Sequence, residues 1–463
     1  MTSRKKPSIY NPAGMQKRFG LLLLLAAIAL LTLNGSQAAA REGETSYSVL
    51  YNFTGGADGG SPDAGVIRDE AGNLYGTTYG GGSAGAGVVF RLDRKGNETV
   101  LYSFTGGTDG GSPVAGLIRD EDGNLYGTTS SGGNLSSPLC HGIGCGVVFR
   151  LDSSGNETVL HSFSGGADGD YPTAGLIRDA WGNFYGTTES GGNGSSSCPF
   201  GSGGCGVVFK LDPWGKETVL YTFSGGADGA IPDASLIRDK AGNLYGTAQL
   251  GGNSSSPLCI TFGCGVVFKL DRWGKETVLY AFTGGADGSG PYASLVRDAA
   301  GNLNGTTGYA GNLSSPLCAP FGGCGVVFKV DPTGKETVLY TFTGAADGST
   351  PFGGLTAGGN GVGDPVGNLY GTTSSGGNLT SPSCAGSGGC GVVFKVNPSG
   401  KQTVLHAFSG TDGSFPFLEN LLKHQGSLYG TAVGGGTYGA GVIFKVTLGD
   451  ERDDQREHDQ GDH

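Results

Sequence analysis

The chain has 463 residues, of which 94 are glycine and only 15% are charged, and its formal net charge is −11. An acidic surface argues against nucleic acid and anionic membranes as partners, while it permits cations such as calcium. The glycines follow no Gly-X-Y period and the apolar residues stand in ordered blocks, which excludes collagen and predicts glycine-rich turns between short strands.

Residues 1–40 are predicted to be a secretory signal peptide. Basic residues such as Arg4 and Lys17 precede the apolar run Leu21–Leu33, and the small residues Ala38 and Ala40 follow it. The apolar run is too short to span a bilayer comfortably, although a retained N-terminal anchor is the alternative. We therefore expect a mature chain without a membrane span that is secreted, extracellular or periplasmic.

Residues 41–447 contain one unit of about 60 residues written seven times. Each copy holds four short apolar blocks, L-I-R, N-L-Y-G-T, V-V-F-K-L and T-V-L-Y-x-F, which are rich in β-branched and aromatic residues and so predict strands. Short D-x-x-G links such as Asp69–Gly72 and Asp93–Gly96 join the first strand to the second and the third to the fourth. The sequence therefore predicts an all-β, seven-bladed β-propeller of four-stranded antiparallel blades.

The phase of the repeat predicts how the ring closes. The first expected strand, Tyr47–Phe53, copies the fourth block, whereas the last one, Val442–Val446, copies the third. We expect the N-terminal strand to complete a last blade formed by Leu418–Val446, because this pairing removes an open sheet edge. The protein is expected to be a monomer. Residues 448–463 are expected to form a disordered acidic tail.

Alternating strand direction predicts two different faces. The tight-turn face carries the D-x-x-G turns. The long-loop face carries the F-T-G-G-A-D-G-x-x-P links between blades and the Gly/Ser-rich stretches between the second and third strands, such as Gly80–Gly87. Binding sites usually lie on long loops held by a rigid scaffold, so the long-loop face is the candidate binding surface.

Ten cysteines stand in five close pairs within these stretches. Paired cysteines in an exported protein predict disulfides, whereas a zinc site would need two further ligands for each pair. The expected bonds are Cys140–Cys145, Cys198–Cys205, Cys259–Cys264, Cys318–Cys324 and Cys384–Cys390.

One aspartate of the G-G-A-D-G link recurs in every copy and is the candidate ligand-binding residue. Seven carboxylates on one face suit calcium or a cationic ligand. The alternative is an Asp-Gly turn in which the carboxylate caps backbone amides, and recurrence in every copy favours that role. The residues are Asp58, Asp109, Asp168, Asp228, Asp287, Asp347 and Asp412.

Three tryptophans, Trp181, Trp214 and Trp273, occupy D-x-x-G turns on the tight-turn face. Exposed aromatic rings stack on sugars, but three turn-tip tryptophans equally pack against neighbouring turns. The recurring arginines, such as Arg68 and Arg119, could surround the central channel or pair with the neighbouring turn aspartates, and a structural ion pair is the favoured role because each arginine recurs together with its aspartate.

No catalytic residue is predicted. Gly81–Gly85 matches G-x-S-x-G, but a nucleophile elbow needs a strand–turn–helix that this region lacks. His161 and His406 replace a tyrosine in a strand, where packing explains them, and no Ser/His/Asp or paired-acid arrangement emerges.

The blocks G-N-L-Y-G-T-T, G-V-V-F-K-L-D and G-K-E-T-V-L-Y-x-F resemble the GloVer tandem repeat of bacterial exported proteins, the choice-of-anchor tandem repeat family, over about residues 44–447. The D-x-x-G-N-L-Y spacing is also similar to NHL-type propellers. The resemblance implies a surface or extracellular location and a propeller-like repeat, with no catalytic residues to carry over.

These observations favour a secreted or cell-surface binding or adhesion module whose partner is an extracellular glycan or protein. One alternative is an extracellular carbohydrate-active enzyme, a hydrolase or lyase, on a propeller scaffold. Another is a structural repeat protein stabilised by calcium, the single cofactor that the sequence suggests.

Overall fold

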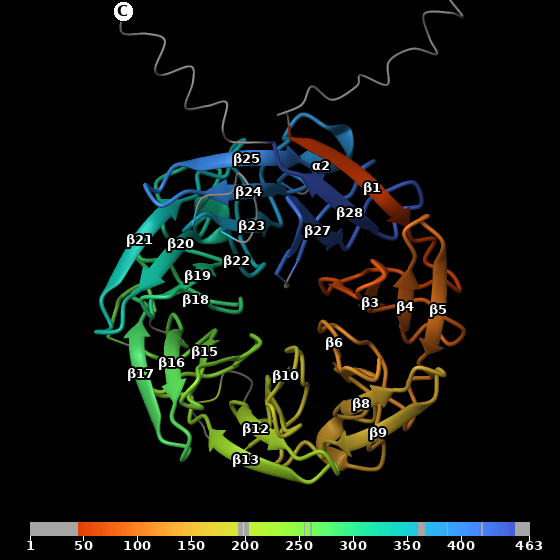
Figure 1. The fold of residues 1–463 in the computed structure, drawn as a ribbon. Coiled ribbons are helices and arrows are strands. Elements are labelled where there is room, and N and C mark those ends of the chain that lie inside the picture. The colour runs from red at the N-terminus through yellow and green to blue at the C-terminus, as the bar shows by residue number, and fades with distance from the viewer. Residues whose placement is uncertain are drawn as a thin grey trace, which may run out of the picture. The chain divides into compact units, whose positions relative to one another are not determined.

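The computed structural model describes residues 45–449 except 193–197, 199–202, 254, 260–261, 360–365, 387 and 418–419. The described chain forms seven four-stranded antiparallel sheets arranged as a ring (Figure 1), which confirms the predicted all-β seven-bladed propeller. The predicted signal peptide lies outside the described residues, as do residues 450–463 of the predicted tail.

Each blade runs outward from a two- or three-residue inner strand. Blade 1 contains β2 (Ile67–Arg68), β3 (Leu74–Thr78), β4 (Val88–Leu92) and β5 (Glu98–Ser103). Blade 2 contains β6 (Ile118–Arg119), β7 (Leu125–Thr129), β8 (Val147–Leu151) and β9 (Glu157–Ser162). Blade 3 contains β10 (Ile177–Arg178), β11 (Phe184–Thr188), β12 (Val207–Leu211) and β13 (Glu217–Thr222). Blade 4 contains β14 (Ile237–Arg238), β15 (Leu244–Ala248), β16 (Val266–Leu270) and β17 (Glu276–Ala281).

The remaining blades follow the same order. Blade 5 contains β18 (Val296–Arg297), β19 (Leu303–Thr307), β20 (Val326–Val330) and β21 (Glu336–Thr341). Blade 6 contains β22 (Thr356–Ala357), β23 (Leu369–Thr373), β24 (Val392–Val396) and β25 (Gln402–Ala407). Blade 7 contains β26 (Leu422–His424), β27 (Ser427–Ala432), β28 (Val442–Thr447) and β1 (Ser46–Asn52). Short helical turns in the cysteine loops are η2 (Pro138–Cys140), η4 (Ala319–Phe321) and α2 (Pro382–Ala385).

The N-terminal strand closes the ring as predicted. In blade 7 the strand order is β1-β28-β27-β26, and Tyr47 pairs with Val446 in an antiparallel register. Figure 1 shows β1 lying beside β28, so the two ends of the described chain meet in one sheet. The hydroxyl of Thr431 also donates to the carbonyl of Ala64 at 2.8 Å, which joins blade 7 to blade 1.

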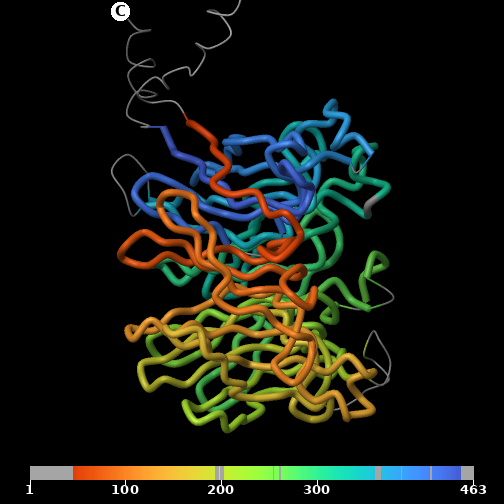
Figure 2. The backbone as a smooth tube through the Cα atoms, turned by 90° about the vertical axis from the view of Figure 1, so that its right-hand side faces the viewer, coloured from red at the N-terminus to blue at the C-terminus, as the bar shows by residue number. Residues whose placement is uncertain are grey.

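The D-x-x-G turns are self-contained hairpins. Asp69 accepts a hydrogen bond from the backbone N–H of Asn73 at 2.8 Å and another from the hydroxyl of Tyr75 at 3.0 Å. One short motif therefore supplies the turn and its side-chain support. Figure 2 shows the ring from the side, with the tight turns at one end of the blades and the long loops at the other.

The core lies between blades. The phenylalanine that follows each outer strand meets the third-strand phenylalanine of the next blade edge-to-face, at 5.1 Å between ring centroids for Phe104 and Phe149. A Cβ on Gly76 would lie 2.6 Å from the Phe90 ring, so glycine is required where the second strand crosses that ring. The seven pairs are Phe53–Phe90, Phe104–Phe149, Phe163–Phe209, Phe223–Phe268, Phe282–Phe328, Phe342–Phe394 and Phe408–Phe444.

Truncating one phenylalanine of these seven interblade pairs is expected to destabilise the whole propeller. Phe282→Ala removes a fully buried ring and should lower the free energy of unfolding by about 3–5 kcal/mol. Trp214→Ala, which truncates a side chain that is 88% exposed, is the matched control and should change it by less than about 0.5 kcal/mol. Denaturant unfolding measures both values, and equal losses would contradict an interblade core.

Candidate functional site

The recurring link aspartates cap their own loops. Asp109 accepts hydrogen bonds from the backbone N–H of Thr105 at 2.8 Å and from the hydroxyl of Tyr102 at 3.1 Å, and the Thr105 hydroxyl donates to it as well. The described residues contain no group of three or more His, Cys, Asp or Glu side chains that would hold a metal ion. The structure therefore gives each aspartate a loop-capping role, and ligand binding by this ring stays a prediction.

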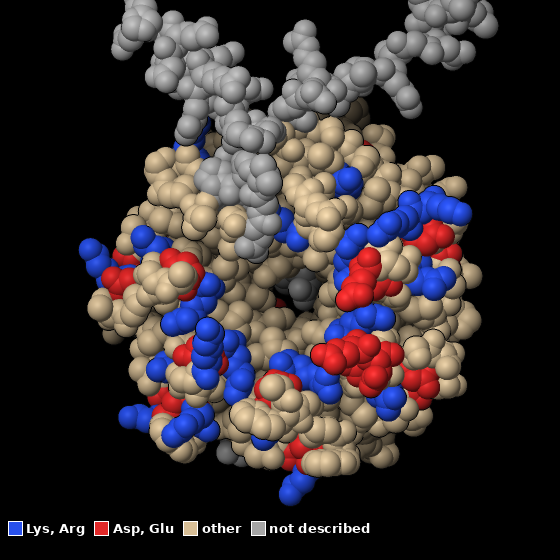
Figure 3. Space-filling model, in the orientation of Figure 1, with Lys and Arg blue, Asp and Glu red and all other residues tan. Residues whose placement is uncertain are grey.

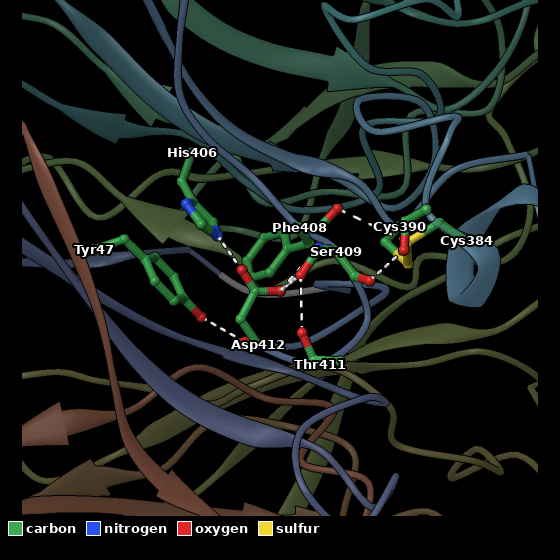
Figure 4. Close-up of polar contacts among 9 residues, drawn as sticks. Tyr47, Cys384, Cys390, His406, Phe408, Ser409, Thr411 and Asp412 are labelled. Carbon is green, nitrogen blue, oxygen red and sulfur yellow. Dashed lines mark hydrogen bonds and ion pairs between the residues drawn. A yellow bond between two sulfur atoms is a disulfide. The ribbon is translucent and has the colours of Figure 1, made fainter. Parts of the chain in front are cut away.

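Two of these aspartates have histidine partners. Nε2 of His406 lies 2.9 Å from Oδ2 of Asp412, and Tyr47 stacks on the His406 ring at 3.6 Å (Figure 4). Burial favours the neutral form of Asp412, but the hydrogen bonds from His406 and Ser409 outweigh it and lower the pKa of the carboxyl. The strand histidine thus does more than pack, because it supports the capping aspartate.

All five predicted disulfides are present, and the described residues include no free cysteine. Their ten sulfur-bearing side chains are buried against the base of the long loops. Bonds of this kind persist in oxidising compartments, which is consistent with an extracellular or periplasmic protein. Within the described ranges no helix is long and apolar enough to cross a membrane.

The three tryptophans stand on the surface. Trp181, Trp214 and Trp273 are 75%, 88% and 76% exposed at turns of blades 3 and 4, so their rings do not pack into neighbouring turns. The guanidinium of Arg272 lies 4.2 Å from the Trp273 ring centroid. Sugar stacking by these rings stays a prediction.

Lysine and arginine are distributed unevenly between the two faces. The long-loop segments contain no lysine or arginine in any of the seven copies. Figure 3 shows lysine and arginine side chains around the central opening of the tight-turn face. Among the described residues no recurring arginine forms a close ion pair with a turn aspartate. Arg119 instead lies over the Tyr75 ring of the preceding blade, 6.0 Å from its centroid. The turn carboxylate of Asp69 already accepts a hydrogen bond from the Tyr75 hydroxyl.

One hollow on the long-loop face is named here the axial pocket. It is a cavity of about 640 Å³, and its lining comes from blades 5, 6, 7 and 1, so it spans the end of the ring axis. The Phe352 ring lies 5.6 Å from Tyr309 and 5.2 Å from Phe417, measured between centroids. The lining residues are Asp63, Tyr309, Thr350, Phe352, Ser374, Ser375, Phe415, Phe417 and Val433.

The axial pocket is built where the repeat varies. The residue after the loop proline varies among the blades, as does the residue that follows T-T or T-A at the end of the second strand. One wall of the axial pocket is aromatic as a result, whereas Asp63 supplies a carboxyl group. Burial raises the pKa of this carboxyl group to about 7. The post-proline residues are Asp63, Val114, Thr173, Asp233, Tyr292, Phe352 and Phe417.

A second hollow of about 550 Å³, named here the acid pocket, lies between the loops of blades 2 and 3. His141, Asp170, Tyr171 and Glu189 line it, and the buried Oδ1 of Asp170 has no hydrogen-bond partner among the described residues. Burial raises the pKa of Asp170 to about 6. Burial, followed by the nearby carboxylates of Asp233 and Asp170, raises the pKa of Glu189 to about 7.

Neither pocket was expected from the sequence, which directed attention to residues that recur. The signal in the sequence that could have located the pockets was variation between the copies. Aligning the seven copies against each other isolates the few columns that vary, and Asp63, Glu189 and Phe352 all stand in such columns. A single site in a symmetric ring needs residues that break the symmetry.

Known structures resemble the fold. A Trichoderma reesei carbohydrate-active enzyme of family AA12 has 12% identity and a TM-score of 0.38, covering 89% of this chain and 99% of its own. The polysaccharide lyase Uly1 has 12% identity and a TM-score of 0.42, covering 90% and 94%. Bacteroides ovatus GH43B from a xyloglucan locus has 12% identity and a TM-score of 0.30, covering 68% and 55%. At such values the likeness is one of general fold.

At the level of sequence, a family model described as the Gloeobacter/Verrucomicrobia repeat matches residues 40–259 and 144–382. No curated protein sequence matches the chain.

The loop-capping role of the aspartates is testable against the calcium interpretation. Asp228→Asn weakens the hydrogen bonds that the carboxylate accepts from Ser224 and Tyr221, so it should lower the free energy of unfolding by about 1–3 kcal/mol. Asp122→Asn, at an exposed turn, is the control. Calorimetry with calcium or a chelator should give the same melting temperature, and a calcium-induced rise that Asp228→Asn abolishes would favour metal binding.

Proposed function

The chain belongs to the Gloeobacter/Verrucomicrobia repeat family, and we propose that it is an exported binding protein that receives a saccharide in its axial pocket. The observation that carries this proposal is the pocket's lining, in which residues that break the repeat form an aromatic wall beside hydroxyl and carboxyl groups.

The mixture of groups suits a sugar. The apolar faces of pyranose rings stack on aromatic side chains, and Phe352, Phe417 and Tyr309 supply such surfaces around one hollow. Ser374, Ser375 and other polar residues at the same lining match a ligand that carries hydroxyl groups.

Charge narrows the choice of ligand. The long-loop segments carry carboxylates but no lysine or arginine, so an anionic ligand would find no cation there. A neutral or amino-bearing saccharide fits this field better than a uronate, a sulfate ester or a nucleotide. The five disulfides and the signal peptide expected at residues 1–40 support an extracellular or periplasmic site of action.

The binding proposal predicts a hit for the intact protein on a glycan array of neutral and amino sugars. Phe352→Ala should lower the affinity for the best ligand by about tenfold to a hundredfold, because it removes the central ring of the aromatic wall. Trp214→Ala should leave the affinity unchanged. Loss of binding in Trp214→Ala alone would move the site to the tight-turn face, and a folded protein without any glycan ligand would overturn the proposal.

A second candidate function, a glycoside hydrolase, rests on the acid pocket. Glu189 in its protonated form would donate a proton to the leaving glycosidic oxygen, while ionised Asp170 would take a proton from the attacking water. The two carboxyls have different environments, and their pKa values of about 7 and about 6 allow both forms to coexist.

Hydrolysis of a polysaccharide panel, followed by release of reducing ends, tests this candidate. The rate should peak between about pH 6 and 7, because Asp170 becomes protonated below that range and Glu189 ionises above it. Glu189→Gln should remove the activity, and Glu121→Gln at an exposed turn should not. A wild-type protein that releases nothing would eliminate the enzyme and leave the binding proposal standing.

A further inference from the structure

One position at the start of each outer strand lies at the junction with the preceding blade. It is the first residue of the strand in blades 1 to 6 and the second residue of β1 in blade 7. This residue pairs with the last residue of the third strand in blades 1 to 6, as Glu98 does with Leu92 and Gln402 with Val396. In blade 7, Tyr47 pairs with Val446, one residue before the end of β28. We call this place the junction position. Gln402 occupies it in blade 6 and Tyr47 occupies it in blade 7. Blades 1 to 5 use Glu98, Glu157, Glu217, Glu276 and Glu336.

The two residues that always carry a proton donor reach across the junction. Nε2 of Gln402 donates to the backbone carbonyl of Asp347 at 3.2 Å, and the hydroxyl of Tyr47 donates to that of Asp412 at 2.6 Å. Figure 4 shows the second of these bonds beside His406. Both carbonyls belong to the capping aspartate in the link that leaves the preceding blade. The junction position thus has one geometric task, which is to donate to this carbonyl.

The five glutamates occupy the same place without a permanent donor. In all five, the buried oxygen Oε1 has no hydrogen-bond partner among the described residues. An ionised carboxylate only accepts hydrogen bonds, so it cannot bond to a carbonyl oxygen, whereas a protonated carboxyl has one O–H to donate. A buried polar atom left without a partner is unfavourable.

We propose that the five glutamates are proton-operated junctions between blades. When protonated, each donates its O–H to the backbone carbonyl of the preceding blade's capping aspartate, as Gln402 and Tyr47 do at all pH values. When ionised, each loses that bond and faces a carbonyl oxygen and a carboxylate, which loosens five of the seven junctions.

The charges around each glutamate favour the protonated form. Burial first, and then the neighbouring Asp58 carboxylate, raises the pKa of Glu98 to about 7, while Tyr51 also lies near. Glu217 differs in that His161 opposes the shift, although burial still raises the pKa of its carboxyl to about 7. The other three glutamates have the same surroundings as Glu98. They face Asp109 with Tyr102, Asp228 with Tyr221, and Asp287 with Tyr280.

The sign of the pH effect follows from the raised values. A carboxyl group whose pKa is higher in the folded protein takes up a proton on folding, so its stabilisation is complete below the ordinary glutamate value and disappears as the pH rises through about 7. Between these limits the unfolding equilibrium constant should rise by up to about tenfold per pH unit for each such glutamate. The ring is therefore braced in acid and loosened near neutrality.

The test replaces all five glutamates by glutamine, copying the natural Gln402. Wild-type protein should lose thermal stability between pH 5 and 8, whereas the fivefold Glu→Gln variant should show a much flatter profile and melt higher than wild type at pH 8. Asp63, Asp170 and Glu189 titrate in the same range but are common to both proteins, so the difference between the profiles isolates the junctions.

Two further variants give opposite expectations. Gln402→Glu should steepen the wild-type decline by adding a sixth titrating junction, and Glu121→Gln at an exposed turn should leave it unchanged. A flat wild-type profile, or a Glu→Gln variant that declines as steeply as wild type, would overturn the proposal.

If the fivefold variant does not fold, wild-type protein still decides the question. Infrared difference spectra should show protonated carboxyl groups that titrate near pH 7, and Glu157→Gln alone should remove part of that signal. Loss of all such signal by pH 6 would equally overturn the proposal.

Discussion

The packing of each blade against the next is the interaction on which the rest of the structure depends. A four-stranded blade with glycine at the centre of its second strand has little core of its own, and its buried phenylalanines meet those of its neighbour. An open row of such blades would leave one apolar face and one unpaired edge at each end. Closure into a ring covers both, which explains why β1 is donated to the last blade.

The same constraint restricts where function is located. Positions that form the contacts between blades must be alike in every copy, because each blade packs against the blade before it and the blade after it through the same pair of surfaces. Variation is tolerated at loop residues that face the axis, where a side chain meets open space rather than the next blade. Asp63 and Phe352 stand at equivalent points of two blades, yet one is a carboxylate and the other an aromatic ring, and together they line one hollow. Asymmetry of chemistry is thus superimposed on symmetry of backbone.

Carboxyl groups in this protein divide according to what surrounds them. At tight turns, hydrogen bonds from Asn73 and Tyr75 outweigh burial and lower the pKa of Asp69. At blade junctions and in the pockets, burial is not offset by amide donors, so the pKa values of Glu98 and Glu189 rise. The ionisable groups that matter for pH response are therefore those that the repeat places away from backbone N–H groups.

By itself, the sequence determined the number of blades, the strand order, the closure by Tyr47–Phe53 and the five disulfides, because these depend on local patterns that each copy states in full. Turn type, strand alternation and short cysteine spacings need no knowledge of distant residues. Only the tertiary structure decided which side chains share a hollow or a junction. Asp63 and Tyr309 are far apart in the chain and line one pocket, and Glu98 faces a loop of another blade. The physical reason is that burial and charge depend on what the ring brings together, and a repeat pattern read along the chain does not contain those distances.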